Sequence, residues 1–284
     1  MVKLPIKTRK IAKALRQVRK EASRDVNILV AGREGVDATG LIEELAPTNE
    51  QRAIFKTLTL DRKSTEELIE EACAIDFALI LLDMTQQFDV DTLAFVVCLA
   101  ELKKPFLIVV DDFDASGFEE FHERIKQFLE ISPTRIVSIS IKRGLGIRTL
   151  IQKILDRCNK EIALASRLPS FRKAAIEKVI RETAAKNALI GGITILPGSD
   201  MPILTANQIR MVLKIAAIHG EKLTLARCKE LLAVVGAGFT FRALARQLLD
   251  LLPGPGWIIK GGVAYGGTVA LGRLAKKYFE GDRG

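Results

Sequence analysis

The sequence predicts an α/β domain built on a parallel sheet, followed by an all-helical domain. Four short apolar runs, rich in β-branched and aromatic residues, alternate with helical patterns in the first half of the chain: residues 27–31, 77–82, 106–110 and 135–139. Uniformly apolar strands that alternate with helices are typical of a parallel sheet covered on both faces. Beyond residue 168 the strand pattern ends, and only helical patterns with Gly and Pro breaks follow.

The length of the chain fits two folded domains of ordinary size. With 284 residues, each part can bury a core without disulfides or metals. The sequence Leu168-Pro169-Ser170 breaks the last helical pattern of the first half. We therefore predict a basic N-terminal helix over residues 1–24, a sheet domain over 25–168 and a helical domain over 169–284. Residues 57–60 form a weaker candidate for an additional strand.

Positive charge is concentrated at the two ends of the chain. Residues 1–24 hold nine basic residues and one acidic residue, a net charge of +8; residues 25–163 hold 16 and 25, a net of −9; residues 164–284 hold 18 and 8, a net of +10. Basic ends favour contact with an anionic surface, although solvated charged faces are an equally ordinary explanation. The first helix has a thin apolar stripe of Ile11, Leu15 and Val18, which predicts that it lies on a membrane or on its own domain.

The partners expected from this charge are an anionic membrane surface or another protein. Nucleic acid is a weaker expectation, because one Trp and two Tyr offer little surface for stacking on bases. The four cysteines are scattered without metal-ligand spacing, and neither a signal peptide nor a membrane-spanning run is visible. We expect a cytoplasmic protein, peripheral on the inner face of the membrane if it contacts lipid.

The turn after the first strand has the outline of a P-loop. Residues 32–39 read GREGVDAT and fill the slot of the motif G-x-x-x-x-G-K-[ST], with Gly32 and Thr39 in place and Gly35 inside the turn. Asp37 replaces the second Gly, and Ala38 replaces the Lys that pairs with phosphate oxygens. A carboxylate and a missing cation both oppose the binding of a polyphosphate.

Over residues 25–160 the chain resembles the translation-factor-like GTPases of the Era type. The resemblance implies a P-loop GTPase-like fold with a switch-two D-x-x-G, which here begins at Asp61 and reads DRKS. It implies a guanine-reading N-K-x-D, which here reads DDFD and ends at Asp114, and a base loop at Ser140 before a Gly-rich turn. The interval from Thr39 to Asp61 is too short for a normal switch-one loop plus a second strand.

The departures from these motifs predict a weak remnant of a nucleotide site and no catalytic residue. The remnant site residues are Gly32, Gly35, Thr39, Asp61, Asp114 and Ser140. No cofactor is expected, with GTP and Mg²⁺ as ligands only if this remnant still binds. Asp114 is also a natural helix N-cap, and the aspartates 111, 112 and 114 are an alternative Mg²⁺ site.

Residues 184–279 resemble the YcjF-like domain of unknown function that accompanies many bacterial GTPases. The residues that carry this likeness are LPGSDMPILT from Leu196, RALARQL from Arg242 and VAYGGT from Val263. The resemblance implies a helical, often membrane-associated module in bacteria. The small residues of the last segment permit close helix approach, either inside a soluble bundle or between membrane helices.

The main functional hypothesis is a pseudo-GTPase, in which a non-catalytic GTPase-like scaffold carries a helical, membrane-proximal module. Asp37 and Ala38 in the phosphate slot are its motivation, and we expect GTP hydrolysis to be lost. The alternatives are a weak GTP-binding regulatory protein and a basic nucleic-acid-binding protein.

Overall fold

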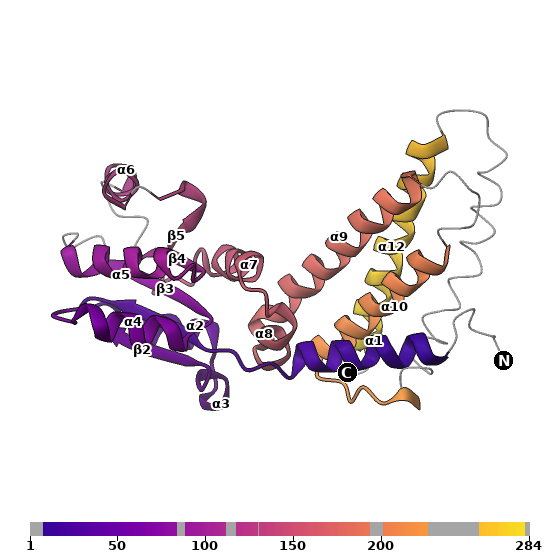
Figure 1. The fold of residues 1–284 in the computed structure, drawn as a ribbon, viewed down its shortest axis with the longest axis horizontal. Helices are drawn as coiled ribbons and strands as arrows, with labels where there is room; N and C mark the ends of the chain where they lie inside the picture. Colours follow the sequence, from indigo (N-terminus) through magenta and orange to yellow (C-terminus); the bar gives the residue numbers. More distant parts are fainter. Residues whose placement is uncertain are drawn as a thin grey trace. The chain divides into compact units, whose positions relative to one another are not determined.

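The chain forms a parallel α/β sheet followed by a helical region, as the sequence predicts (Figure 1). The computed structural model describes residues 8–83, 89–111, 118–129, 131–193, 201–226 and 256–281. The chain divides into two compact units. The sheet unit comprises residues 25–164 and 168–174, and the helical unit comprises residues 1–24, 165–167 and 175–284. These two units are defined by contacts in space, and the predicted division into three domains along the sequence stays a prediction.

Five parallel strands make the sheet, in the order β2-β1-β3-β4-β5. The four strands predicted from apolar runs are confirmed to within about one residue, and the weaker fifth candidate is the edge strand β2. The bounds are β1 Ile28–Gly32, β2 Phe55–Thr59, β3 Phe77–Asp83, β4 Phe106–Asp111 and β5 Ile136–Ile139. The order 2-1-3-4-5 is doubly wound and reverses direction between β1 and β3, which is where such sheets bind ligands.

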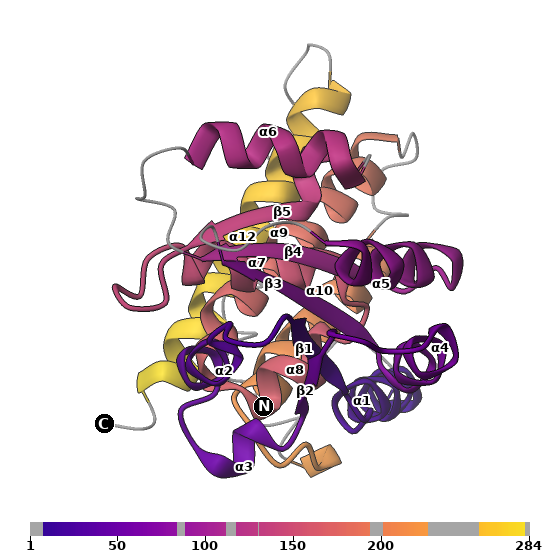
Figure 2. The same cartoon turned by 90° about the vertical axis from the view of Figure 1, so that its left-hand side faces the viewer.

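Helices cover both faces of the sheet (Figure 2). One face packs on α4 (Thr65–Ala74), α5 (Val90–Glu101) and α6 (Phe118–Leu129) around a buried core that includes Phe95 and Phe106. The other face packs on α2 (Ala38–Leu45) and α7 (Ile147–Arg157). Two covered faces explain why the three inner strands, β1, β3 and β4, are apolar along almost their whole length instead of alternating.

The interval between the P-loop-like turn and Asp61 holds two short helices and one strand. These are α2, α3 (Asn49–Arg52) and β2, which pairs parallel with β1. β2 is the single strand of this fully described interval, and no room is left for a normal switch-one loop plus a further strand.

The helical unit contains α1 (Thr8–Ala22), α10 (Met201–Ile218), α12 (Gly256–Gly281) and most of α9 (Pro169–Ile193). The apolar stripe of α1 is buried, and α1 packs on α10. The sequence left open whether this stripe lies on a membrane or on its own domain, and in the structure it packs within the helical unit. Most side chains of α10 are buried.

Two features bind α9, α10 and α12 to one another. The buried Thr268 hydroxyl accepts hydrogen bonds from Asn187 Nδ2 and Gln208 Nε2, each at 3.0 Å, and donates to the Ala264 carbonyl. Gly272 approaches Ile180 so closely that an added Cβ would lie 2.5 Å from Ile180 Cγ1. The small residue Gly272 of α12 thus allows α12 to pack closely on α9 inside this helical unit.

Within the part of the chain that the structure describes, no helix combines the length and apolar character needed to cross a membrane.

Candidate functional site

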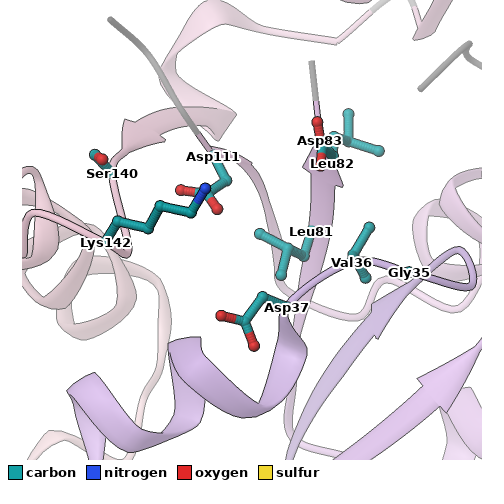
Figure 3. Close-up of a pocket in the computed structure, with 9 residues that line it drawn as sticks. All are labelled: Gly35, Val36, Asp37, Leu81, Leu82, Asp83, Asp111, Ser140 and Lys142. Carbon is teal, nitrogen blue, oxygen red and sulfur yellow. The ribbon is translucent and has the colours of Figure 1, made fainter. Parts of the chain in front are cut away.

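A pocket opens where the carboxyl ends of the parallel strands meet. It has a volume of about 270 Å³ and lies at the β1/β3 switch point of the sheet. Its lining comes from the turn after β1, from the ends of β3 and β4 and from the segment after β5: Gly35, Val36, Asp37, Leu81, Leu82, Asp83, Asp111, Ser140 and Lys142 (Figure 3). The P-loop-like turn and the base-loop position are therefore brought together, as a nucleotide site requires.

Backbone geometry explains the two glycines of the turn. An added Cβ at Gly32 would lie 2.6 Å from Val36 Cγ2 and 2.9 Å from the Leu81 carbonyl oxygen. Gly35 has a φ of +93°, which side chains rarely adopt. Both predicted site glycines are thus needed to make the turn, whether or not a ligand binds there.

Asp37 caps the helix that begins directly after the turn. Its Oδ1 accepts a hydrogen bond of 2.8 Å from the Gly40 backbone N–H, and α2 begins at the next residue. An added Cβ at Gly40 would lie 2.1 Å from Asp37 Oδ2, so the carboxylate sits tightly against the first turn. The start of a helix attracts anions through its unpaired N–H groups and its dipole. The protein itself supplies a carboxylate there.

The pocket is acidic. Asp37, Asp83 and Asp111 contribute three carboxylates, and Lys142 contributes one ammonium, a formal charge of −2 by this count. Asp111 Oδ1 accepts a hydrogen bond of 2.9 Å from the Ile141 backbone N–H, and the Lys142 side chain extends toward Asp111 (Figure 3). This charge is the opposite of what a polyphosphate cradle needs.

Asp61 lies outside the pocket lining and holds the turn in place. Its Oδ2 accepts from the Glu34 backbone N–H at 2.7 Å, and its Oδ1 lies 3.4 Å from Arg33 Nε. Arg33 Nε also lies 2.7 Å from Asp89 Oδ2, the carboxylate that caps α5. The hydrogen bond from Glu34, followed by that from Arg33, lowers the pKa of Asp61, although desolvation opposes this. The predicted switch-two aspartate is thus tied to the turn.

Of the remaining predicted residues, the structure describes Thr39 and Ser140. Thr39 lies in the first turn of α2 and outside the pocket lining. Ser140 lines the pocket and forms an antiparallel bridge with Leu145, before Gly146 with φ +77°. Asp114, predicted to read guanine, lies outside the described residues, as does Asp112.

Two charged residues of the lining, Asp83 and Lys142, were not predicted from the sequence. Asp83 is the first polar residue after the apolar run of β3, and Lys142 follows β5 by three residues. Polar residues directly after buried parallel strands share one sheet edge, so this position in the sequence is the signal that identifies them.

Among the described residues, no group of three or more His, Cys, Asp or Glu side chains is placed to hold a metal ion. Two of the three aspartates of the alternative Mg²⁺ site lie outside that set.

Burial raises the pKa of Cys98 and Cys158, while Cys73 is exposed; Cys228 is not described. His219 is buried and stacks on Phe279 with ring centroids 5.6 Å apart. None of Cys73, Cys98, Cys158 and His219 is among the residues that line the pocket.

Comparison with known proteins finds similarity only at the level of solved structures. No protein family model matches the chain, and no curated protein is significantly similar to it. Translation elongation factor SelB from Methanococcus maripaludis, solved in complex with the GTP analogue GppNHp, is 19% identical over 48% of this chain, with a TM-score of 0.37. The match covers 35% of the SelB chain.

The FeoB G-domain from Methanococcus jannaschii is similar to the same extent. It is 16% identical over 46% of this chain and 96% of its own, with a TM-score of 0.34. These low identities and TM-scores say nothing about a ligand or a reaction of this chain.

Proposed function

We propose that the chain is a pseudo-GTPase, in which a non-catalytic GTPase-like scaffold carries a helical module near an anionic membrane. The observation that supports it best is the Asp37 carboxylate, hydrogen-bonded to the Gly40 N–H at the start of α2. A phosphate at that position would have to displace a carboxylate that is part of the chain.

The energetic penalty for a nucleotide is large. Two unit charges about 4 Å apart repel by roughly 4 kcal/mol at an effective dielectric constant near 20. Asp83 and Asp111 add to the repulsion, and Ala38 supplies no counter-charge where a P-loop has its Lys. Lys142 offsets only one of the three carboxylates.

Restoring the phosphate cradle tests this proposal. We expect wild-type protein to show no rise in unfolding temperature with millimolar GTP and Mg²⁺. The double variant Asp37→Gly and Ala38→Lys should gain a saturable rise, since a ligand at 100 times its Kd stabilises by about 2.7 kcal/mol. The single variant Asp37→Asn, which keeps a cap but not the charge, separates the two effects.

The proposal is wrong if wild-type protein hydrolyses GTP above background and Thr39→Ala abolishes that turnover. A nucleotide-dependent stabilisation of the wild-type chain without turnover would instead favour the second candidate, a weak GTP-binding regulatory protein. Ser140 and Lys142, a donor and a cation in the same pocket, are the observations in favour of that candidate.

The membrane part of the proposal rests on α1 and on the resemblance to the YcjF-like domain. Arg9, Lys13, Arg16 and Lys20 are exposed and spaced i, i+4, i+7 and i+11, which puts them on one face of the helix. That face is opposite the buried Ile11, Leu15 and Val18. Such a row of cations suits anionic lipid headgroups, to which each contributes about 1 kcal/mol near the surface.

Vesicle co-sedimentation tests this contact. We expect the chain to sediment with phosphatidylserine vesicles at low salt, and the variant with Gln at positions 9, 13, 16 and 20 to stay in solution. A matched control replaces four exposed cations of the sheet unit, Lys56, Lys103, Arg124 and Arg143, with Gln. Equal sedimentation of both variants would refute the role of α1, and salt-sensitive retention on DNA instead of vesicles would favour nucleic acid.

A further inference from the structure

Besides the pocket of the sheet unit, the helical unit contains a cavity of its own, and its lining is basic. It has a volume of about 180 Å³ and lies between α9 and α10. Its lining is mostly polar or charged: Val179, Glu182, Thr183, Lys186, Asn207, Arg210, Met211 and Lys214. All of these residues belong to one compact unit.

Arg210 is the most informative residue of the cavity. Its Nε is fully buried and has no hydrogen-bond partner among the residues that the structure describes. Arginine presents five N–H donors in a fixed fork, and a buried donor without an acceptor is costly. Nε itself has no accessible surface, so an acceptor in the cavity would bind the outer N–H groups of the guanidinium of Arg210, which lines the cavity.

The charges of the cavity indicate an anionic occupant. Lys186, Arg210 and Lys214 supply three positive charges against the single carboxylate of Glu182, a formal charge of +2. Glu182 lies 3.8 Å from Lys178, and Lys214 Nζ lies 3.2 Å from Glu21 Oε2. Even if Glu21 is counted, the local charge stays at +1.

The volume and the donors indicate what kind of anion fits. The cavity is smaller than the about 300–1,000 Å³ of sites for drug-sized ligands. A guanidinium fork with flanking ammonium groups matches the tetrahedral oxygens of a phosphate group.

We propose that this cavity binds a phosphate group, either as free phosphate or as the phosphomonoester headgroup of a lipid, with Arg210 as its central ligand. The N–H donors of Arg210 bind phosphate oxygens, and Lys186 and Lys214 neutralise the charge. This inference does not depend on the state of the pocket in the sheet unit.

Titration with inorganic phosphate tests the site directly. Unfolding is followed by far-ultraviolet circular dichroism, to which the helices α10 and α12 contribute. We expect a saturable rise in the unfolding temperature with phosphate, and none with chloride at the same ionic strength. Arg210→Gln should abolish the rise, which is measured for each variant from its own midpoint without phosphate.

Arg273→Gln is the matched control, since Arg273 is an exposed arginine of α12 outside the cavity lining. It should bind phosphate like the wild type. A second arm uses phosphatidylcholine vesicles with and without phosphatidic acid. Binding only to vesicles with phosphatidic acid, lost in Arg210→Gln, would identify the lipid headgroup as the source of the phosphate.

Two results would overturn the proposal. One is a phosphate effect of equal size in wild type and in Arg210→Gln, which would mean non-specific screening. The other is the absence of any Arg210-dependent response in both the phosphate and the vesicle arm.

Discussion

At the scale of single residues, Asp37 caps α2, and the proposed function also makes its carboxylate a barrier to phosphate. Its carboxylate caps α2 through the Gly40 N–H. Replacing an Asp N-cap with Ala typically costs about 1 kcal/mol, whereas Gly costs only a few tenths. We therefore expect Asp37→Ala to lower the free energy of unfolding by about 1 kcal/mol in urea titration, and Asp37→Asn to leave it nearly unchanged. Equal losses for Ala and Asn would mean that the charge, not the cap, stabilises the helix.

The ionisation of Asp61 makes a pH-dependent contribution to the stability of the fold. Hydrogen bonds from Glu34 and Arg33 lower this pKa in the folded state. A lowered folded-state pKa stabilises fully above the unfolded-state pKa, and the stabilisation is lost as the pH falls through the folded value. We expect Asp61→Ala to be less stable than wild type by about 1 kcal/mol at neutral pH. The two should converge at strongly acidic pH, measured by urea unfolding followed by circular dichroism.

The control for Asp61 is Asp61→Asn, which keeps an acceptor but cannot ionise. Its difference in stability from wild type should also shrink in acid. A deficit of Asp61→Ala that is constant across the acid range would contradict the role of ionisation.

At the scale of elements, the glycines of α12 divide into two kinds. An added Cβ at Gly266 meets nothing within 4 Å, whereas at Gly272 it would press on Ile180. Alanine is better than glycine in a helix by about 1 kcal/mol, but overpacking costs about 1–3 kcal/mol. We expect Gly266→Ala to raise the midpoint of unfolding followed by circular dichroism, and Gly272→Ala to lower it. A rise in both variants would show that α9 and α12 are not in close contact.

The Thr268 hydroxyl joins three helices, so its removal should affect the whole helical unit. Thr268→Val has almost the same shape but leaves the amide donors of Asn187 and Gln208 without their acceptor. A buried donor without a partner costs about 1–3 kcal/mol. We expect Thr268→Val to lose at least that much stability in denaturant titration, and Thr268→Ser, which keeps the hydroxyl, to lose less. Equal losses would assign the effect to packing.

The elements could be predicted because each has a local pattern. Apolar runs fully buried on both faces identified the inner strands, and the stripe of Ile11, Leu15 and Val18 identified α1. The surface on which an apolar stripe packs cannot be predicted from its local pattern. A membrane and a helix about 200 residues away would bury the same side chains equally well. Only the fold decides between them, and it selects α10.

At the scale of the whole molecule, the candidate site was predicted only in part for a similar reason. Gly32, Gly35 and Ser140 follow from a motif read along the chain. Asp83 and Lys142 reach the same pocket from strands that the motif does not mention, and their contribution depends on which strand ends are neighbours. The role of Asp61 as a brace of the turn also depends on a contact across 27 residues of sequence.

The helical unit is assembled from both ends of the chain, and this has a consequence for any truncation. Deleting residues 1–24 removes Ile11, Leu15 and Val18 from their buried positions on α10. Each such side chain stabilises by about 1.5–3 kcal/mol, so the deletion should destabilise the helical unit by on the order of 5 kcal/mol.

Hydrogen exchange resolved by segment can test this prediction. After the deletion, the amides of α10 should exchange much faster, whereas those of β3, buried within the sheet unit, should keep their protection. Loss of vesicle binding on deletion would therefore be ambiguous, and the substitutions at positions 9, 13, 16 and 20 are the cleaner test of the basic face. Unchanged exchange in α10 would mean that α1 does not stabilise the helical unit, and its apolar stripe would again be available to a membrane.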